Sequence, residues 1–115
     1  MGLPKIGDSQ SPEDFDALLA QARKASDFLK ALSHESRLLI LCLLAEGEKS
    51  VSELEDIMKM PQAAVSQQLA RLRFDRLVNT RRDGRVVYYS IASAEVSSVI
   101  GTLYDLFCAP VRKPG

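Results

Sequence analysis

The polar side chains between residues 62 and 73 are the first in this sequence whose types suggest a chemistry. The segment contains no carboxylate, since the next one along the chain is Asp75. Its uncharged polar residues are all Gln or Ser. Gln can pair with adenine through two hydrogen bonds in the major groove, Ser can pair with several base edges, and Arg binds guanine or phosphate. A solvated surface helix, the ordinary alternative, usually mixes Glu with Lys. The segment therefore favours DNA recognition, and the residues expected to contact DNA are Gln62, Ser66, Gln67, Gln68 and Arg71.

A second basic segment comes directly after it. Two β-rich runs, 77–80 and 86–91, flank an arginine-rich connection in which Asp83-Gly84 predicts a hairpin with a type I′ turn. Three arginines are then expected at the hairpin tip: Arg81, Arg82 and Arg85. Residues 71–85 contain six arginines and two aspartates, a net charge of +4, whereas the whole chain has a formal net charge of zero. Positive charge is thus concentrated where phosphate groups would lie.

Cys42 and Cys108 are the only cysteines, and His34 is the only histidine. Two cysteines are too few to build a zinc module by themselves, and a reducing compartment disfavours a permanent disulfide. From the residues alone, each cysteine is most simply interpreted as a small buried hydrophobe, because a reactive thiol needs a partly exposed site that favours the thiolate. His34 is expected to cap a helix or to form a surface hydrogen bond. We therefore predict no metal site and no cofactor.

A short helix, a turn and a second helix are expected to position the DNA-contacting residues. Ser50 and Glu53 have the spacing of a capping box, which begins the first helix. Pro61 suits the first position of the second helix, where its missing N–H costs nothing. Along that helix the apolar stripe of Val65, Leu69 and Leu72 predicts the buried face.

The remaining segments predict helices at both ends of the chain. Residues 1–10 lack periodicity and are expected to form a disordered tail, and 11–110 to form one DNA-binding and dimerisation domain. Within it, a long amphipathic helix begins at Ser11-Pro12, a wholly apolar helix covers 38–45, and a last helix begins at Ser93. The fold class is mainly α (α+β), a winged helix-turn-helix of order α-α-α-α-β-β-α. Apolar faces on the terminal helices suggest a homodimer through them, which would read a palindromic duplex.

Composition narrows the class of protein. The longest apolar run is too short to span a bilayer, and the N-terminus lacks the pattern of a signal peptide, so we expect a cytoplasmic protein without a membrane partner. An enzyme such as a thiol peroxidase is disfavoured, because the sequence has no Cys-x-x-Cys and no phosphate-binding glycine loop. A winged helix that docks proteins instead of DNA would have little use for an arginine-rich wing.

Three motifs, within roughly residues 26–92, resemble those of ArsR/SmtB repressors. Residues 32–38 are similar to the family's L-x-x-x-x-R segment, 62–69 to its recognition helix, and 81–89 to its R-x-G-R-x-x-Y-Y wing. Gln68 stands where the family usually has His. The family commonly senses metals, but its Cys-x-Cys and its paired His and acidic ligands are missing here.

Cys42 and Cys108 resemble instead the cysteine pair of the family's sulfide-responsive, SqrR/BigR-like subgroup. That resemblance implies a repressor of sulfide-detoxification genes in which reactive sulfur species join the two thiols through a sulfur bridge and DNA is released. The alternatives are an ArsR-type repressor that senses a soft metal such as mercury, or a general thiol oxidant, through the same cysteines, and one without an effector.

Overall fold

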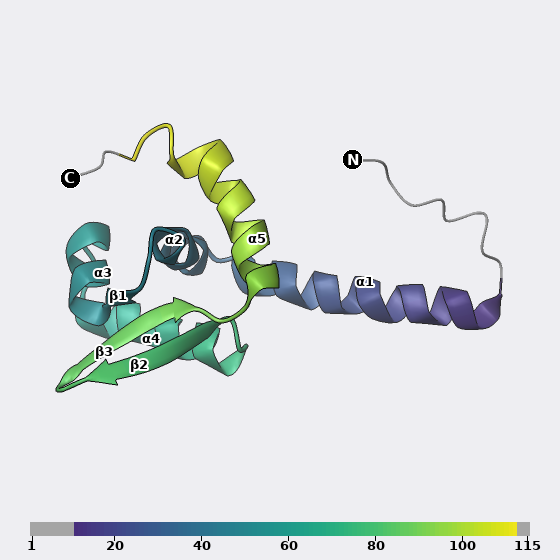
Figure 1. Cartoon of the computed structure of the whole chain (residues 1–115), viewed down its shortest axis with the longest axis horizontal. Coiled ribbons are helices and arrows are strands. Elements are labelled where there is room, and N and C mark those ends of the chain that lie inside the picture. The colour runs from purple at the N-terminus through teal and green to yellow at the C-terminus, as the bar shows by residue number, and fades with distance from the viewer. Residues whose placement is uncertain (1–10, 113–115) are drawn as a thin grey trace. The chain divides into compact units, whose positions relative to one another are not determined.

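The computed structural model describes residues 11–112 (Figure 1). The tail expected at residues 1–10 lies outside the described residues. The chain divides into two compact units, the first ending at Lys30 and the second beginning at Ala31. The elements are α1 (Pro12–Leu32), α2 (Glu35–Leu44), β1 (Lys49–Ser50), α3 (Val51–Met58), α4 (Gln62–Phe74), β2 (Val78–Asp83), β3 (Val86–Ile91), α5 (Ala94–Leu103) and the π-helical turn η2 (Tyr104–Cys108).

Helix α1 begins where the sequence predicts. The Ser11 hydroxyl accepts a hydrogen bond from the Asp14 N–H at 3.1 Å, which caps the first turn. Glu13 and Asp14 lie in that turn, where negative charge is favourable beside the helix N-terminus. Several apolar residues of α1 have exposed side chains, among them Phe15, Leu18 and Leu29.

The core of the second unit is formed around α2. This helix is capped by His34, whose Nδ1 accepts a hydrogen bond from the Ser36 N–H at 3.2 Å, as expected for a histidine at a helix start. Its residues from Ile40 to Leu44 are all buried, which confirms the predicted central helix there, whereas Leu39 and Ala45, near the two ends of the predicted segment, are exposed. Among residues 11–112, the largest fully buried side chains are Ile40, Leu41, Leu54, Val65, Leu69, Leu72 and Ile100. Each such side chain stabilises the fold by about 1.5–3 kcal/mol relative to its exposed state.

An antiparallel sheet of order β1-β3-β2 borders this core. Strand β1 was not predicted from the sequence, because only two residues form it. It pairs Lys49 with Tyr89 and Ser50 with Tyr88, so the loop after α2 is hydrogen-bonded to the hairpin. The mainly α winged-helix class is confirmed, with this third strand as an addition to the predicted order.

The turn between β2 and β3 differs from the prediction. Asp83 pairs with Val86, so the two central turn residues are Gly84 and Arg85 instead of Asp83 and Gly84. Gly84 has φ +63°, whereas Arg85 is not among the residues with positive φ. Positive φ at the first central position alone is the pattern of a type II′ turn, not type I′. Consequently Arg81 and Arg82 lie within β2, and of the three arginines only Arg85 is at the tip.

The last helix changes its winding before it ends. The Ser93 hydroxyl accepts a hydrogen bond from the Val96 N–H at 3.2 Å and begins α5, as predicted. After Leu103 the chain forms η2, in which the Ala109 N–H donates to the Tyr104 carbonyl, five residues back, at 2.8 Å. One extra residue in a turn rotates the later residues by roughly 100° relative to a continuous α-helix. Cys108, at the end of η2, is half-buried, whereas Phe107 before it is exposed.

Candidate nucleic-acid interface and dithiol site

The helix-turn-helix is formed by α3 and α4. The predicted capping box is present: the Ser50 hydroxyl accepts from the Glu53 N–H at 3.2 Å, and the Glu53 carboxylate accepts from the Ser50 N–H at 3.0 Å. Helix α3 ends at Lys59, which adopts the left-handed conformation with φ 54°. Pro61 precedes the first helical residue of α4 by one position, because its ψ of 148° is extended. The predicted start of this helix was therefore one residue early.

Helix α4 presents the expected buried stripe and most of the expected polar surface. Val65, Leu69 and Leu72 are fully buried. Gln62, Gln67 and Arg71 are exposed, and Ser66 is half-buried. The amide oxygen of half-buried Gln68 accepts a hydrogen bond from Arg37 Nη1 at 3.3 Å, so α2 and α4 are joined at this side chain.

Arg37 connects three segments, and the sequence did not reveal this role. Besides its contact with Gln68, its Nε donates to the Ala31 carbonyl at 2.8 Å, at the end of α1. The family motif contained Arg37, but no periodicity or spacing identified its partners. Arg37 therefore joins α2 to the end of α1 and to α4.

The arginines predicted at the wing have different surroundings. Arg81 Nε donates to the Glu48 carboxylate at 3.1 Å, and its guanidinium lies 4.7 Å from the centre of the Tyr88 ring. This hydrogen bond lowers the pKa of Glu48. Arg82 and Arg85 are exposed. On α4, Arg71 Nε is 3.1 Å from the Asp75 carboxylate. Of the four candidate arginines, Arg71 and Arg81 therefore each form an exposed ion pair with a carboxylate of the same chain.

The two cysteines come together in the second unit. Cys42 in α2 is 4% exposed, Cys108 is half-buried, and both thiols are free. The two side chains are neighbours, since both line one cavity. Burial, followed by the influence of the neighbouring Cys108, raises the pKa of Cys42 to about 12. Cys42 is therefore a protonated thiol at neutral pH.

A mostly apolar cavity of about 170 Å³ adjoins both thiols. Its walls are formed by α2 and by the chain around η2, and its lining residues are Leu39, Cys42, Leu43, Glu46, Tyr104, Phe107, Cys108, Val111 and Arg112. Within residues 11–112, no cluster of three or more His, Cys, Asp or Glu side chains could hold a metal ion. The same part of the chain contains no helix long and apolar enough to cross a membrane.

The arrangement of α3, α4 and the β2–β3 hairpin defines a winged helix-turn-helix, the class of many DNA-binding regulators. Residues 34–80 match the family described as bacterial regulatory protein, arsR family. The transcriptional activator HlyU of Vibrio cholerae is 42% identical over 98 residues, 85% of this chain and 91% of its own. The biofilm growth-associated repressor of Agrobacterium fabrum is 40% identical over 94 residues, 82% of this chain and 80% of its own.

Among solved structures, the transcriptional repressor BigR from Xylella fastidiosa superposes with a TM-score of 0.79 at 36% identity, covering 90% of this chain and all of that one. The chain belongs to the ArsR family. It is a DNA-binding transcriptional regulator in the BigR-like group of ArsR/SmtB proteins, and not an enzyme.

Proposed function

We propose that the protein is a homodimeric repressor that releases a palindromic operator when persulfides or polysulfides link Cys42 to Cys108. The observation that carries this proposal is that two free thiols, Cys42 and Cys108, line one mostly apolar cavity. Two relatives of the chain, from Agrobacterium fabrum and Xylella fastidiosa, are named as repressors.

The chemistry needs a sulfane donor as oxidant, and the exposure of the thiols suggests the order of steps. The more accessible Cys108 thiolate attacks the outer sulfur of a persulfide R–S–SH and displaces the thiolate RS⁻, which leaves Cys108–S–SH. Cys42 loses its proton, attacks the Cys108 sulfur and displaces HS⁻, which closes a disulfide. The two electrons of the thiols depart on the released sulfide.

DNA recognition is assigned to α4 and to the wing. We assign base edges to the polar residues of α4 and phosphate to the arginines: Gln62, Ser66, Gln67, Gln68, Arg71, Arg81, Arg82 and Arg85. The ion pairs of Arg71 with Asp75 and of Arg81 with Glu48 are exposed. Exposed pairs contribute about 0–1 kcal/mol, so exchanging either carboxylate for a phosphate costs little.

The homodimer is supported by exposed apolar residues on both candidate helices. On α1 these are Phe15, Leu18 and Leu29, and near the C-terminal end they are Val99, Leu106, Phe107 and Val111. Large apolar side chains exposed in such numbers on an element mark interaction sites. A twofold dimer would place two copies of α4 about 34–36 Å apart, one turn of duplex.

The test measures affinity for a palindromic operator before and after treatment with glutathione persulfide, mercury(II) or hydrogen peroxide. Wild-type protein should bind when reduced and release DNA after persulfide treatment. Cys42→Ser and Cys108→Ser proteins should bind when reduced and stay bound afterwards, because one thiol cannot close the bridge. If Cys42→Ser still releases DNA, modification of Cys108 alone suffices and the two-cysteine mechanism is wrong. Release by mercury but not by persulfide would identify a soft-metal sensor instead.

A further inference from the structure

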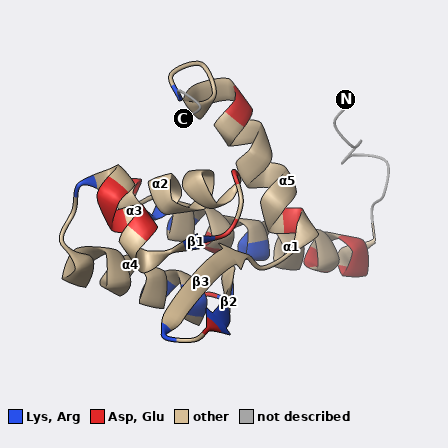
Figure 2. Ribbon diagram, turned by 60° about the vertical axis from the view of Figure 1, so that its left-hand side comes forward, with Lys and Arg blue, Asp and Glu red and all other residues tan. Residues whose placement is uncertain are grey.

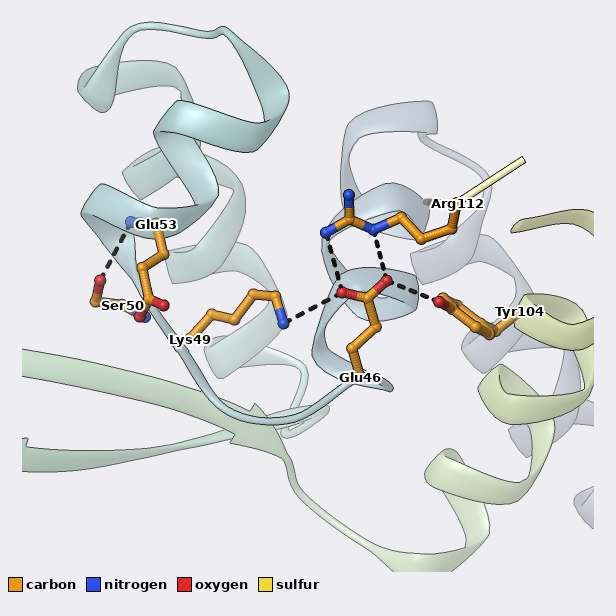
Figure 3. A network of polar contacts seen from close by, with 6 residues as sticks. All are labelled: Glu46, Lys49, Ser50, Glu53, Tyr104 and Arg112. Carbon is orange, nitrogen blue, oxygen red and sulfur yellow. Dashed lines mark hydrogen bonds and ion pairs between the residues drawn. The ribbon is translucent and has the colours of Figure 1, made fainter. Parts of the chain in front are cut away.

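A single carboxylate, that of Glu46, accepts hydrogen bonds from two different parts of the chain (Figure 3). Arg112 donates to it twice, through Nε at 2.7 Å and Nη2 at 3.2 Å. The Tyr104 hydroxyl donates at 2.7 Å, and Lys49 Nζ lies 3.4 Å away. We call these four residues the Glu46 cluster.

The Glu46 cluster lies beside the thiols in both sequence and space. Glu46 follows Cys42 by four residues, and Tyr104 and Arg112 stand four residues before and after Cys108. Glu46, Tyr104 and Arg112 line the same cavity as the two cysteines. The carboxylate thus joins the segment that carries one thiol to the segment that carries the other.

We propose that Glu46, acting through Arg112 and Tyr104, is a positioning residue that holds Cys108 against Cys42 while the sulfur bridge closes. This inference rests on the proposed function. Once Cys108 carries a sulfane sulfur, closure by Cys42 competes with capping of Cys42 by a second donor molecule. Closure is intramolecular, so its rate depends on how often the two sulfur atoms are in line, whereas capping depends on donor concentration.

The contacts on the C-terminal side explain why positioning is needed. The Val111 side chain is 79% exposed, and the Val111 and Arg112 N–H groups both donate to the Cys108 carbonyl, at 3.0 and 2.8 Å. These bonds are local to the segment and do not attach it to α2. Among the described residues, the bidentate contact of Arg112 and the Tyr104 hydroxyl make that attachment at Glu46. Arg112, above all, lowers the pKa of Glu46 to about 2, so the carboxylate stays charged at neutral pH.

The experiment compares wild type with Glu46→Gln, which keeps the size of the side chain and removes its charge. Reduced proteins are treated with glutathione persulfide over a range of concentrations, remaining thiols are alkylated, and intact mass gives the ratio of bridged to separately capped protein. For Glu46→Gln this ratio should fall about tenfold, the effect of losing a hydrogen bond to a charged group. Glu48→Gln is the matched control, because Glu48 also pairs with an arginine but lies outside the cavity lining.

A double-mutant cycle separates positioning from general destabilisation. If Glu46 acts through Arg112, the single change Arg112→Gln should also lower the ratio of bridged to capped protein. Combining Glu46→Gln with Arg112→Gln should then lower this ratio no further than either change by itself. Circular dichroism verifies that each variant is folded. If the wild-type protein forms the bridge and Glu46→Gln has the same ratio of bridged to capped protein, this inference is overturned and the proposed function stands. A wild-type protein that never bridges would overturn both.

Discussion

At the scale of single residues, Arg82 and Gln67 differ in what their loss should do to DNA binding. Both are exposed, Arg82 in β2 and Gln67 on α4 opposite the buried stripe. Arg82→Ala should weaken operator and scrambled duplex by the same factor and reduce the slope of log affinity against log salt by about one unit. Gln67→Ala should instead lower the operator's advantage over the scrambled duplex by roughly 1–3 kcal/mol.

Titration of the binding free energy against salt, for both duplexes and both variants, measures these effects. A change of preferred sequence in Arg82→Ala at an unchanged salt slope would contradict its assignment to phosphate. An unchanged operator-to-scrambled ratio in Gln67→Ala would mean that a different face of α4 meets the bases.

Glu46 should make the stability of the protein depend on acid pH. Its pKa is about 2 in the folded protein against an ordinary value of 4.5, so near pH 3 the unfolded chain binds a proton that the folded chain does not. The stabilisation is therefore complete above about pH 4.5 and is lost as pH falls towards 2. We expect it to be about 1 kcal/mol, because water screens a partly exposed ion pair.

Urea unfolding of wild type and Glu46→Gln across this range tests the expectation. The difference in free energy of unfolding should be constant from pH 7 to 5 and should shrink below that. A difference that stays constant down to pH 3 would show that the charge of Glu46 is not what stabilises the fold.

At the scale of elements, the wing depends on the backbone of Gly84. Its φ of +63° is strained for any residue with a Cβ, although a Cβ there would meet no atom within 4 Å. Gly84→Ala should cost about 1–3 kcal/mol of stability for backbone reasons alone. Arg85→Ala, at the adjacent turn position, is the matched control and should change stability by less than about 0.5 kcal/mol. Thermal unfolding measures both, and equal losses would contradict the type II′ geometry.

The same hairpin illustrates how far the sequence predicts the elements. Periodicity and capping signals were sufficient for α1, α2, α3 and α5, since these patterns are local. The predicted turn was off by one residue because Asp-Gly and Gly-Arg are both acceptable central pairs, and only strand pairing decides between them. A two-residue β1 and the π-helical turn leave no periodic signal at all.

The candidate sites, too, contain features that the sequence predicts and contacts that it does not. The buried stripe of α4 and the basic wing could be predicted because their residues are close in sequence. The partners of Gln68 and Arg81, namely Arg37 and Glu48, come from distant segments, and so does the Glu46 cluster around the cysteines. Contacts of this kind depend on tertiary packing, which residue spacing does not encode.

At the scale of the whole molecule, a neutral chain separates its charges between surfaces. Basic residues gather at the end of α4 and along the wing, and acidic residues on α3 (Figure 2). The thiols are in α2 and η2, and α2 contacts α4 through the Arg37–Gln68 hydrogen bond. A bridge between the thiols can affect DNA only if the bridged and reduced proteins differ in their affinity for it.

The effect of the bridge on DNA affinity must equal the effect of DNA on bridge formation, and the last prediction tests this equality. If the bridge weakens operator binding by a coupling free energy of about 1–3 kcal/mol, operator binding must disfavour the bridge by the same factor, roughly 5–150-fold. Wild-type protein is equilibrated with mixtures of glutathione persulfide and glutathione, and intact mass gives the ratio of bridged to reduced chains. Saturating operator should lower that ratio by the factor measured for DNA affinity, whereas a scrambled duplex at equal concentration should lower it much less. If the operator leaves the ratio unchanged while the bridge still releases DNA, the two measurements do not describe one equilibrium. Release would then result from an irreversible change such as unfolding, and not from a switch between two dimer arrangements.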